Sequence, residues 1–341
     1  MTADTAERAE RDEEQQARRG AGTREAFRRA LTELAGRDPR VWCCDSDMGG
    51  LAGGFARSHP GQYVDLGIAE ANLMSVAAAL AASGKIPFVN TMASFAALRA
   101  GEQVKVDIAY NDLPVHIAAS HSGLSGGHFG ATHQALEDLA VMRALPNMTV
   151  VVPADAAAAE QAVAAVAALP GPSYLRLGRK PTPPVHEPGA RFVLGRAARL
   201  RAGDDVALLA CGPHPLMAAL AAHDRLAAAG IGARVLDMAT IKPLDLEAVV
   251  AAAAQTRGLV TVEEHNVIGG LGGAVAEALA ELSPAPLRRV GIRDRFCEHV
   301  GGHEDLLRVY GVTADAVTRA ATALCGAPAA PPTTAKEMIF P

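Results

Sequence analysis

Short apolar runs alternate with longer Ala-rich stretches over residues 22–180. Runs of this length bounded by Gly, Pro, Asp or Ser are typical of strands, and the Ala-rich stretches are typical of helices. The helices are expected at about Thr23–Ala35, Ala71–Ala82 and Ala156–Leu169. The six strands are expected at Val41–Cys44, at Val64–Leu66, from Pro87 onward, and at Pro114–Ala119, Thr149–Val152 and Ser173–Leu177. This alternation predicts an α/β domain.

A proline cluster separates this domain from a second one. Four prolines fall within Pro181–Pro188, a composition typical of an extended linker. Beyond it, apolar runs separated by Ala-rich helices predict a second, smaller α/β domain, with strands at Val206–Ala210, Ala233–Leu236 and Gly258–Val262. The expected division is a flexible N-terminal segment (1–21), a first domain (22–180), a linker (181–192), a second domain (193–325) and a tail (326–341).

Composition excludes several classes of protein. The net charge of −5 and the 4% aromatic content provide neither a basic surface nor stacking platforms for nucleic acid. No apolar run of membrane-spanning length is free of charge, Gly and Pro, and the Glu- and Arg-rich start is not a signal peptide. The five cysteines form no CxxC pair. They are interpreted as reduced thiols of a cytoplasmic protein.

Glu70 falls where a short apolar run and a glycine give way to a helix. Turns of this kind line the ligand crevice of open parallel sheets, and the neighbouring Leu, Ile and Ala residues would desolvate the carboxylate. A proton-transfer role is therefore one hypothesis. The alternative is that Glu70 only stabilises the positive end of the helix dipole.

A Gly-rich loop that follows the strand ending near Ala119 carries three histidines, His121, His128 and His133. Glycines let such a loop approach a ligand closely, which favours acid/base or hydroxyl-binding roles. No HExxH pair or adjacent Cys or carboxylate lies at metal-ligand spacing, so no metal site is assigned. Met92 and Phe95, three residues apart, would share a face and form a pocket wall, or else pack in the core.

Polar residues also follow the first and last strands of this domain. Asp47 follows the first strand, where it either lines a site or caps the strand as an Asx turn. A basic cluster lies at the end of the last strand: Arg176, Arg179 and Lys180. An arginine there would bind two oxygens of a phosphate at once, or the cluster would simply be solvated. The glycines around Gly270 suggest a dinucleotide fingerprint only weakly, because the sixth position is Val275.

Several segments in this order resemble the transketolase family. They are Asp65–Asn72, Thr91–Gln103, Ala131–Asp138, Arg143–Met148 and Val152–Asp155 for the pyrimidine-binding domain, and Val262–Gly273 for the start of the C-terminal domain. The resemblance covers residues 22 to 325. It implies a doubly wound parallel sheet that binds the pyrimidine of thiamin diphosphate, followed by the smaller C-terminal domain.

The same resemblance implies that the diphosphate-binding half of the enzyme lies on another chain. Transketolases hold the diphosphate through Mg²⁺ with a Gly-Asp-Gly motif on a separate N-terminal domain, and this sequence contains no Gly-Asp-Gly. The chain is therefore expected to be the C-terminal subunit of a split enzyme. Its partner would be an N-terminal subunit that supplies the metal ligands, with two copies of each chain in an α2β2 heterotetramer.

The resemblance also implies roles for individual residues of this sequence. By resemblance, Glu70 binds the aminopyrimidine ring nitrogen, with Asp47 and Phe95 in the cofactor pocket. His121 and His133 lie near the reacting carbonyl and hydroxyls, and Arg179 binds a terminal phosphate.

Four positions depart from the family pattern. His128 and Phe129 replace Glu and Asp, so a carboxylate that recognises a donor hydroxyl is missing. Met92 stands where Phe stacks on the pyrimidine, and Leu98 where some members have Tyr. Losing a buried partner for a substrate hydroxyl shifts specificity strongly, so the donor is expected to differ from a standard pentose phosphate.

The leading hypothesis is a transketolase-like transfer of a two-carbon ketol unit from a ketose phosphate to an aldehyde. An alternative is a 2-oxo acid-using relative, similar to deoxyxylulose-phosphate synthase or to the β-subunit of a 2-oxo acid dehydrogenase. Arg179 favours the first and Phe129 the second. A non-catalytic subunit and a nucleotide-binding dehydrogenase are further alternatives; the first conflicts with the presence of Glu70, His121 and His133.

Overall fold

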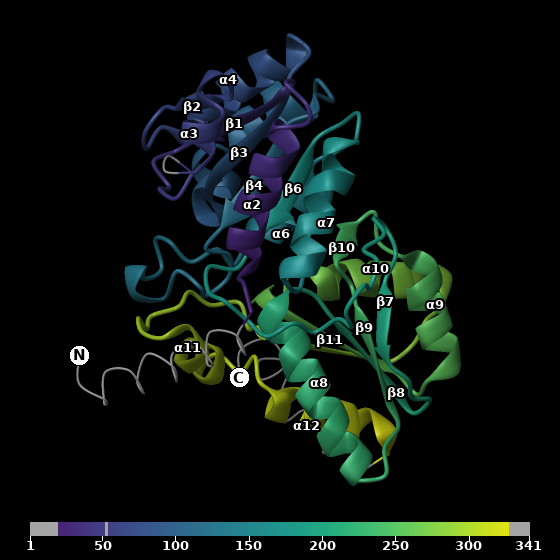
Figure 1. Cartoon of the computed structure of the whole chain (residues 1–341). Helices are drawn as coiled ribbons and strands as arrows, with labels where there is room; N and C mark the ends of the chain where they lie inside the picture. Colours follow the sequence, from purple (N-terminus) through teal and green to yellow (C-terminus); the bar gives the residue numbers. More distant parts are fainter. Residues whose placement is uncertain (1–19, 52–53, 327–341) are drawn as a thin grey trace, which may run out of the picture.

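The computed structural model describes residues 20–51 and 54–326, which form two α/β lobes (Figure 1). The expected flexible segment, apart from residues 20 and 21, and the expected tail, apart from Gly326, lie outside the described residues. The first lobe contains the chain before the proline cluster, and the second contains most of the chain after it.

The first lobe is built on a seven-stranded sheet with the order β10-β5-β6-β4-β3-β1-β2. The six predicted strands are confirmed, and all pair in parallel. They are β1 (Val41–Asp45), β2 (Tyr63–Asp65), β3 (Ile86–Met92), β4 (His116–Ser120), β5 (Thr149–Val151) and β6 (Ser173–Arg176). The seventh, β10 (Thr240–Lys242), comes from the second half of the chain and pairs antiparallel with β5.

Helices cover both faces of this sheet, as expected for a doubly wound fold. Adjacent residues of β1 illustrate the two faces: Cys43 belongs to the same buried cluster as Phe27 of α2, and Cys44 belongs to the cluster that contains Leu73 of α4. The helices are α2 (Thr23–Ala35), α3 (Phe55–Ser58), α4 (Glu70–Ala82), α5 (Gly101–Gln103), α6 (Asp138–Ala144) and α7 (Ala156–Ala167). The tighter or wider helical turns are η1 (Pro60–Gln62), η2 (Phe95–Arg99), η3 (Val104–Ala109) and η4 (Gly127–Phe129).

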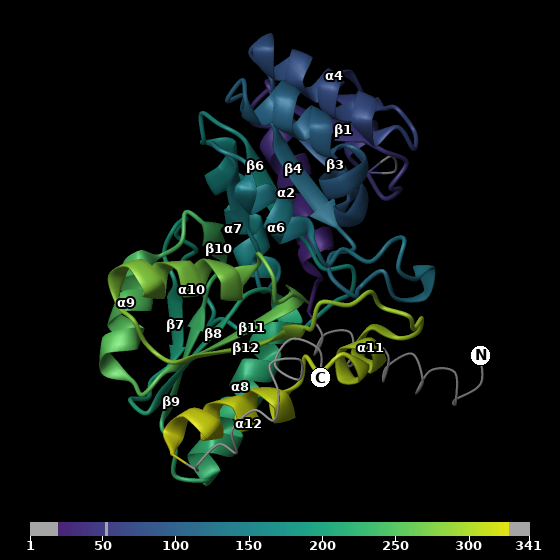
Figure 2. The same ribbon diagram turned by 180° about the vertical axis from the view of Figure 1, so that it is seen from behind.

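The second lobe contains a five-stranded sheet with the order β12-β11-β8-β9-β7, in which only β7 runs antiparallel to its neighbour. Helices α8 and α12 cover one face, and α9 and α10 cover the other (Figure 2). The strands are β7 (Ala198–Arg201), β8 (Val206–Ala210), β9 (Ala233–Asp237), β11 (Leu259–Asn266) and β12 (Leu287–Ile292). The helices are α8 (Pro213–Ala228), α9 (Leu246–Gln255), α10 (Leu271–Leu282), α11 (His303–Val309) and α12 (Ala314–Cys325).

The two lobes share one apolar core. Met142 and Val150 of the first lobe belong to the same buried cluster as Leu209 and Leu271 of the second. Because β10 also returns to the first sheet, the lobes are joined by packing and by strand pairing as well as by the linker. Among the described residues, no helix has the length and apolar character needed to cross a membrane.

Candidate active site

Residues expected at the site lie at one edge of the first sheet, where its parallel strands end. Asp47 follows β1, Glu70 follows β2, Met92 ends β3, and His121 follows β4. The order β6-β4-β3-β1-β2 places these strand ends side by side. Such an edge is where open α/β sheets bind ligands.

Glu70 is the first residue of α4, and its side chain is only 2% exposed. Its Oε2 atom accepts a hydrogen bond of 3.0 Å from Nη1 of Arg99. The Arg99 guanidinium also lies 3.9 Å from the centroid of the Phe95 ring, in a cation–π contact. The predicted desolvation of Glu70 is therefore confirmed, and Arg99 is its charged partner. Sequence reasoning gave Arg99 no site role, because no spacing rule links residues so far apart.

Four aromatic rings, one from η2 and three from the glycine-rich loop, form what we call the ring cluster: Phe95, His121, Phe129 and His133. The ring of His133 lies between Phe95 and Phe129, with centroids 5.1 and 5.2 Å away. Phe129 also lies 6.2 Å from His121. Phe129 is 48% exposed, so it forms the outer wall of the cluster. The structure thus brings together both predicted catalytic histidines, the predicted pocket phenylalanine Phe95, and Phe129, which stands where the family has an aspartate.

His121 is held in an unusual backbone conformation, with φ of 58°, and is 5% exposed. A non-glycine residue in this region is rare and is often found at functional sites. Burial, together with the charges of Arg24, Arg179 and Arg28, lowers the pKa of His121 to about 4. Its ring is therefore neutral near pH 7, with Nδ1 2.9 Å from the Ser120 hydroxyl oxygen.

The positive charge near His121 comes from two elements. Arg179, expected from the sequence, places its guanidinium 5.3 Å from the Phe129 ring. Arg24 and Arg28 belong to α2, and sequence reasoning missed them because α2 is distant in sequence from the glycine-rich loop. Arg24 and Arg28 both form ion pairs with Glu25, which leaves Arg179 as the arginine that favours an anionic ligand at this end of the cluster.

Arg176 does not belong to this group, contrary to the expected basic cluster. It is 4% exposed, and it donates to both carboxylate oxygens of Asp138 over 2.7 and 3.0 Å. It also donates to the backbone carbonyls of Ala135 and Glu264. Its role is to tie the second lobe to the loop of the first, which leaves Arg179 half-buried beside the ring cluster and Lys180 exposed.

Three predicted site residues lie on the surface. Asp47 is exposed with φ of 55°, and its backbone N–H donates to Asp65. The strand cap is instead Asp45, a buried carboxylate whose Oδ1 accepts from Asn90 over 2.8 Å and whose pKa is raised by burial. Leu98 is 61% exposed, and His128 is also exposed. Met92 is half-buried at the end of β3.

The glycines around Gly270 serve packing within the second lobe. The carboxylate of Glu263 accepts hydrogen bonds from the backbone N–H groups of Leu271 and Gly272, at 2.7 and 2.8 Å. A Cβ at Gly270 would lie 2.0 Å from this carboxylate, so only glycine fits there. The first N–H groups of α10 are therefore already satisfied. This explains the glycines without a dinucleotide.

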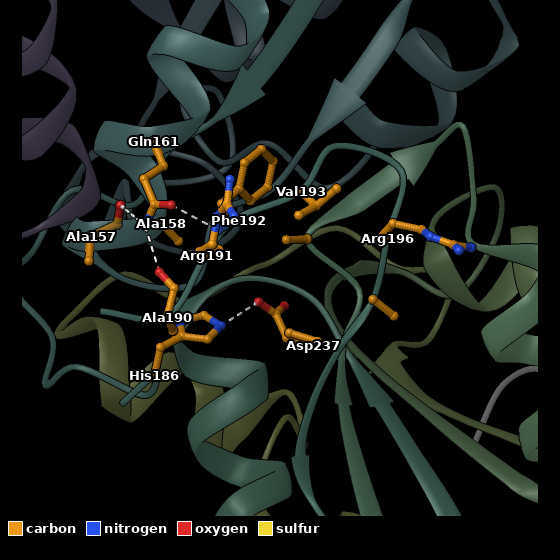
Figure 3. A pocket seen from close by; sticks show the side chains of 13 residues that line it. Ala157, Ala158, Gln161, His186, Ala190, Arg191, Phe192, Val193, Arg196 and Asp237 are labelled. Carbon is orange, nitrogen blue, oxygen red and sulfur yellow. Dashed lines mark hydrogen bonds and ion pairs between the residues drawn. The ribbon is translucent and has the colours of Figure 1, made fainter. Parts of the chain in front are cut away.

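A cavity of about 150 Å³ lies at the linker and shares no residue with the ring cluster (Figure 3). On its wall, His186 contacts Asp155 of the first lobe through Nδ1 (2.8 Å) and Asp237 of the second through Nε2 (3.1 Å). The hydrogen bond to Asp155, joined by the ion pair with Asp237, raises the pKa of His186 to about 10. The linker is thus pinned to both lobes by a charged histidine.

Comparisons with known proteins identify the family of both parts of the chain. Residues 19–184 match the transketolase pyrimidine-binding domain, and residues 195–317 match the transketolase C-terminal domain. The chain is 43% identical to the 6-deoxy-6-sulfo-D-fructose transketolase subunit SqwH of Clostridium sp. (strain MSTE9), over 87% of this chain and 92% of the relative. It is 40% identical to an apulose-4-phosphate transketolase subunit of Phocaeicola vulgatus, over 87% and 96%.

Solved structures show the same relationship. A protein described as a split gene transketolase, inactive β4 tetramer, superimposes with a TM-score of 0.84 at 47% identity, over 90% of this chain and 99% of that chain. The transketolase of Campylobacter jejuni has the same fold, with a TM-score of 0.73 at 21% identity, and this chain covers 46% of its length. The predicted family and fold are confirmed: the chain belongs to the transketolase family of transferases, and corresponds to the section that carries the pyrimidine-binding and C-terminal domains.

Proposed function

We propose that the chain is the C-terminal, β-type subunit of a split thiamin diphosphate-dependent transketolase-like enzyme of the cytoplasm. It would transfer a two-carbon ketol unit from a ketose donor to an aldehyde acceptor. The observation that carries the proposal is the buried carboxylate of Glu70, held by Arg99 beside the ring cluster. The names of the two curated relatives, both subunits of sugar transketolases, support it.

The residues around Glu70 fit the aminopyrimidine half of the cofactor. A carboxylate that is 2% exposed accepts a strong hydrogen bond from a protonated ring nitrogen, and the neighbouring Phe95 offers an aromatic wall. We assign Glu70, Met92 and Phe95 to this pocket, together with Asp47 and Leu98, which are exposed in this chain and would face the cofactor in the assembly. When bound, thiamin diphosphate supplies the carbon nucleophile and electron sink that carbon–carbon bond cleavage requires.

The diphosphate half requires another chain. The sequence contains no Gly-Asp-Gly motif, so the Mg²⁺ ligands are assigned to an N-terminal partner subunit. Two apolar side chains close in sequence to Glu70 and Arg99 are exposed: Ile68, two residues before Glu70, is 71% exposed, and Leu98, next to Arg99, is 61% exposed. Contact with a partner would bury this apolar surface. An α2β2 heterotetramer is the proposed assembly, and the solved β4 relative, described as inactive, agrees with the need for a second kind of subunit.

The chain's own histidines would handle the donor. His121 has its pKa lowered to about 4, so its ring is neutral at physiological pH, with one nitrogen that accepts a hydrogen bond and one that donates. His133 is half-buried between two aromatic rings, with Nδ1 2.9 Å from the Thr132 hydroxyl oxygen. Both would position the donor carbonyl and hydroxyls and exchange protons with them. His128, which is exposed on the same loop, would contact the donor farther out.

The donor is expected to carry an anionic end. Arg179 reaches the ring cluster, and the charges of Arg24 and Arg28 also act on His121. A phosphate and a sulfonate both present anionic oxygens that the Arg179 guanidinium can bind, and the names of the two curated relatives contain one substrate of each kind. Phe129 covers the side where the family has a hydroxyl-binding carboxylate, so a donor with fewer hydroxyls at that position is favoured.

The test is an activity measurement on the reconstituted enzyme. The purified chain is mixed with its N-terminal partner, thiamin diphosphate and Mg²⁺, and ketose phosphates and sulfonates are screened as donors with an aldehyde acceptor. We expect ketol transfer without release of carbon dioxide. Carbon dioxide released in step with product would instead identify a 2-oxo acid donor.

Glu70→Gln tests whether the subunit is catalytic. Replacing the carboxylate by an amide of the same shape is expected to lower kcat at least ~100-fold in the assembled enzyme. Glu102→Gln, a change on the neighbouring α5, is the matched control and should retain wild-type activity. Full activity of Glu70→Gln would show that the subunit only completes the fold of its partner.

A further inference from the structure

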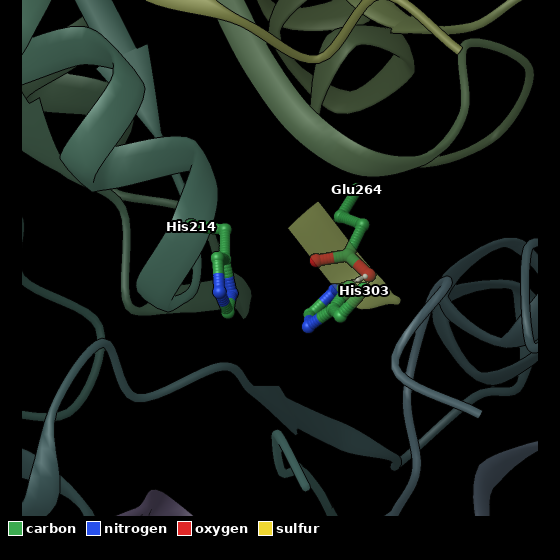
Figure 4. A group of neighbouring side chains, drawn as sticks. All are labelled: His214, Glu264 and His303. Atoms are coloured by element: carbon green, nitrogen blue, oxygen red, sulfur yellow. Dashed lines mark hydrogen bonds and ion pairs between the residues drawn. The ribbon is translucent and has the colours of Figure 1, made fainter. Parts of the chain in front are cut away.

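Three potential metal ligands converge where the second lobe meets the glycine-rich loop. They are His214 near the start of α8, Glu264 in β11 and His303 at the start of α11 (Figure 4). One ligand atom from each lies within 4.8 Å of the other two. We propose that these side chains bind a divalent transition metal ion of the Zn²⁺ type. This site is separate from the Mg²⁺ assigned to the partner subunit.

The donor set determines the class of metal. Two imidazoles and one carboxylate are typical ligands of Zn²⁺, whereas Mg²⁺ and Ca²⁺ prefer oxygen donors alone. Zinc is usually four-coordinate, so three protein ligands leave one position for water. Tetrahedral bonds of about 2.0–2.2 Å place ligand atoms roughly 3.3 Å apart. The side chains therefore have to close slightly around the ion.

Glu264 and His303 are buried, His214 is half-buried, and the three side chains are only partly hydrogen-bonded. His303 is 3% exposed, and its Nδ1 atom has no hydrogen-bond partner in the described part of the chain. Its Nε2 lies 2.7 Å from Oε1 of Glu264. The His214 ring contacts the His303 ring edge-on, with centroids 4.1 Å apart. A buried nitrogen without a partner is costly, and metal coordination would satisfy the cluster.

The space between the side chains suits one small ion. A cavity of about 10 Å³ is bordered by His214, Glu264 and His303, and this volume holds about one water-sized sphere. Arg176 also borders it, but its charge is compensated by the two hydrogen bonds to Asp138. Glu264 therefore contributes the negative charge that a cation requires.

The bound ion would connect the second lobe to the loop that carries the proposed catalytic residues. Oε1 of Glu264 also accepts a hydrogen bond of 2.6 Å from the backbone N–H of Leu124. Leu124 is three residues after His121 and five before Phe129 in the same loop. Fixing Glu264 with a metal would hold this loop in place. The sequence did not indicate the site, because its members lie on three separate elements with no motif spacing.

The experiment uses the full chain, purified without a histidine tag and freed of metal by a chelator. We expect one equivalent of Zn²⁺ to bind per chain, and a hundredfold excess of zinc over its Kd to raise Tm by about 5 °C. Excess Mg²⁺ should not displace the zinc. Co²⁺ should bind at the same stoichiometry and give the intense visible absorption of a four-coordinate site.

Two variants and one control locate the binding. His214→Phe retains the ring contact but removes a ligand, and Glu264→Gln retains the shape of the carboxylate. Each should lose the zinc-dependent rise in Tm, and far-UV circular dichroism establishes that each is folded. His223→Gln, in the same helix α8, should bind zinc like the wild type. The proposal is overturned if the wild-type chain binds no zinc, or if folded His214→Phe retains both the stoichiometry and the Tm rise.

Discussion

Arg99 donates a 3.0 Å hydrogen bond to Glu70 from a helical segment that begins four residues earlier, at Phe95. The guanidinium is 47% exposed, whereas the carboxylate is almost completely buried. Arg99 therefore connects a desolvated acid to the surface that the partner subunit is proposed to cover. A buried carboxylate without this bond would lack a charged partner among the described residues.

Replacing Arg99 with Gln is expected to lower the free energy of unfolding by about 1–3 kcal/mol, because the Glu70 carboxylate stays buried and loses its charged donor. In the assembled enzyme, kcat should fall about tenfold as the carboxylate loses its fixed orientation. Chemical denaturation of the chain and turnover of the complex measure the two effects. Arg99→Lys is the control and should recover part of both. Wild-type stability in Arg99→Gln would show that the Arg99–Glu70 pair contributes nothing to the free energy of unfolding.

Phe129→Asp is expected to change donor preference. The new carboxylate returns a hydrogen-bond acceptor to the position where the family has one, and it removes the ring that packs against His121 and His133. The ratio of kcat/KM for a hydroxylated ketose phosphate over the native donor should rise at least ~10-fold. Phe129→Leu is the matched control, since it removes the ring without adding an acceptor. Equal ratios in the two variants would contradict a specificity role.

His116 is predicted to make the chain sensitive to acid. It is fully buried in β4, and burial lowers its pKa to about 3, below the ordinary value of 6.5. A group with a lowered folded pKa binds protons preferentially when unfolded. Its contribution to stability is therefore present above pH 6.5 and is lost as the pH falls from there toward 3.

Between pH 7.5 and 5, this loss amounts to about 2 kcal/mol for His116. Urea denaturation at both values should show a smaller decrease for His116→Asn than for the wild type, by about that amount. His223→Asn, a half-exposed histidine of α8, should behave like the wild type. An unchanged pH dependence in His116→Asn would mean that the ring accepts a proton in the folded chain.

His186, the histidine of the linker, gives stability the opposite dependence on pH. The hydrogen bond to Asp155 and the ion pair with Asp237 raise the pKa of His186 to about 10, so the folded chain binds a proton that the unfolded chain releases above 6.5. The stabilisation is complete below pH 6.5 and is lost as the pH rises through 10. From pH 7.5 to 9.5, the wild type should lose about 2–3 kcal/mol more than the double variant His186→Asn/Asp237→Asn. An equal loss of unfolding free energy in the two proteins over this pH range would contradict a charged His186 between the two aspartates.

The sequence predicted those features that depend on local pattern. The six strands, the helix that begins at Glu70 and the burial of that carboxylate follow from apolar runs and from the place where one run ends. The grouping of His121 and His133 was expected because both lie on one loop.

Contacts between distant segments could not be predicted in this way. The pairing of β10 with β5 crosses the domain boundary that the prolines suggested, and a three-residue strand has no distinctive pattern. Arg176 looked like a phosphate ligand because its charge is visible in the sequence, whereas its partner Asp138 is 38 residues away. Arg24, Arg28 and Arg99 were missed for the same reason: their partners are set by tertiary packing.

The most direct test of the central claim is calorimetric titration of thiamin diphosphate with Mg²⁺ into this chain alone, into the N-terminal partner alone and into their mixture. The split-site account predicts tight binding only in the mixture, because this chain provides the pyrimidine pocket and the partner provides the diphosphate and metal ligands. Equally tight binding by this chain alone would contradict the account, since the cofactor site would then be complete without a partner.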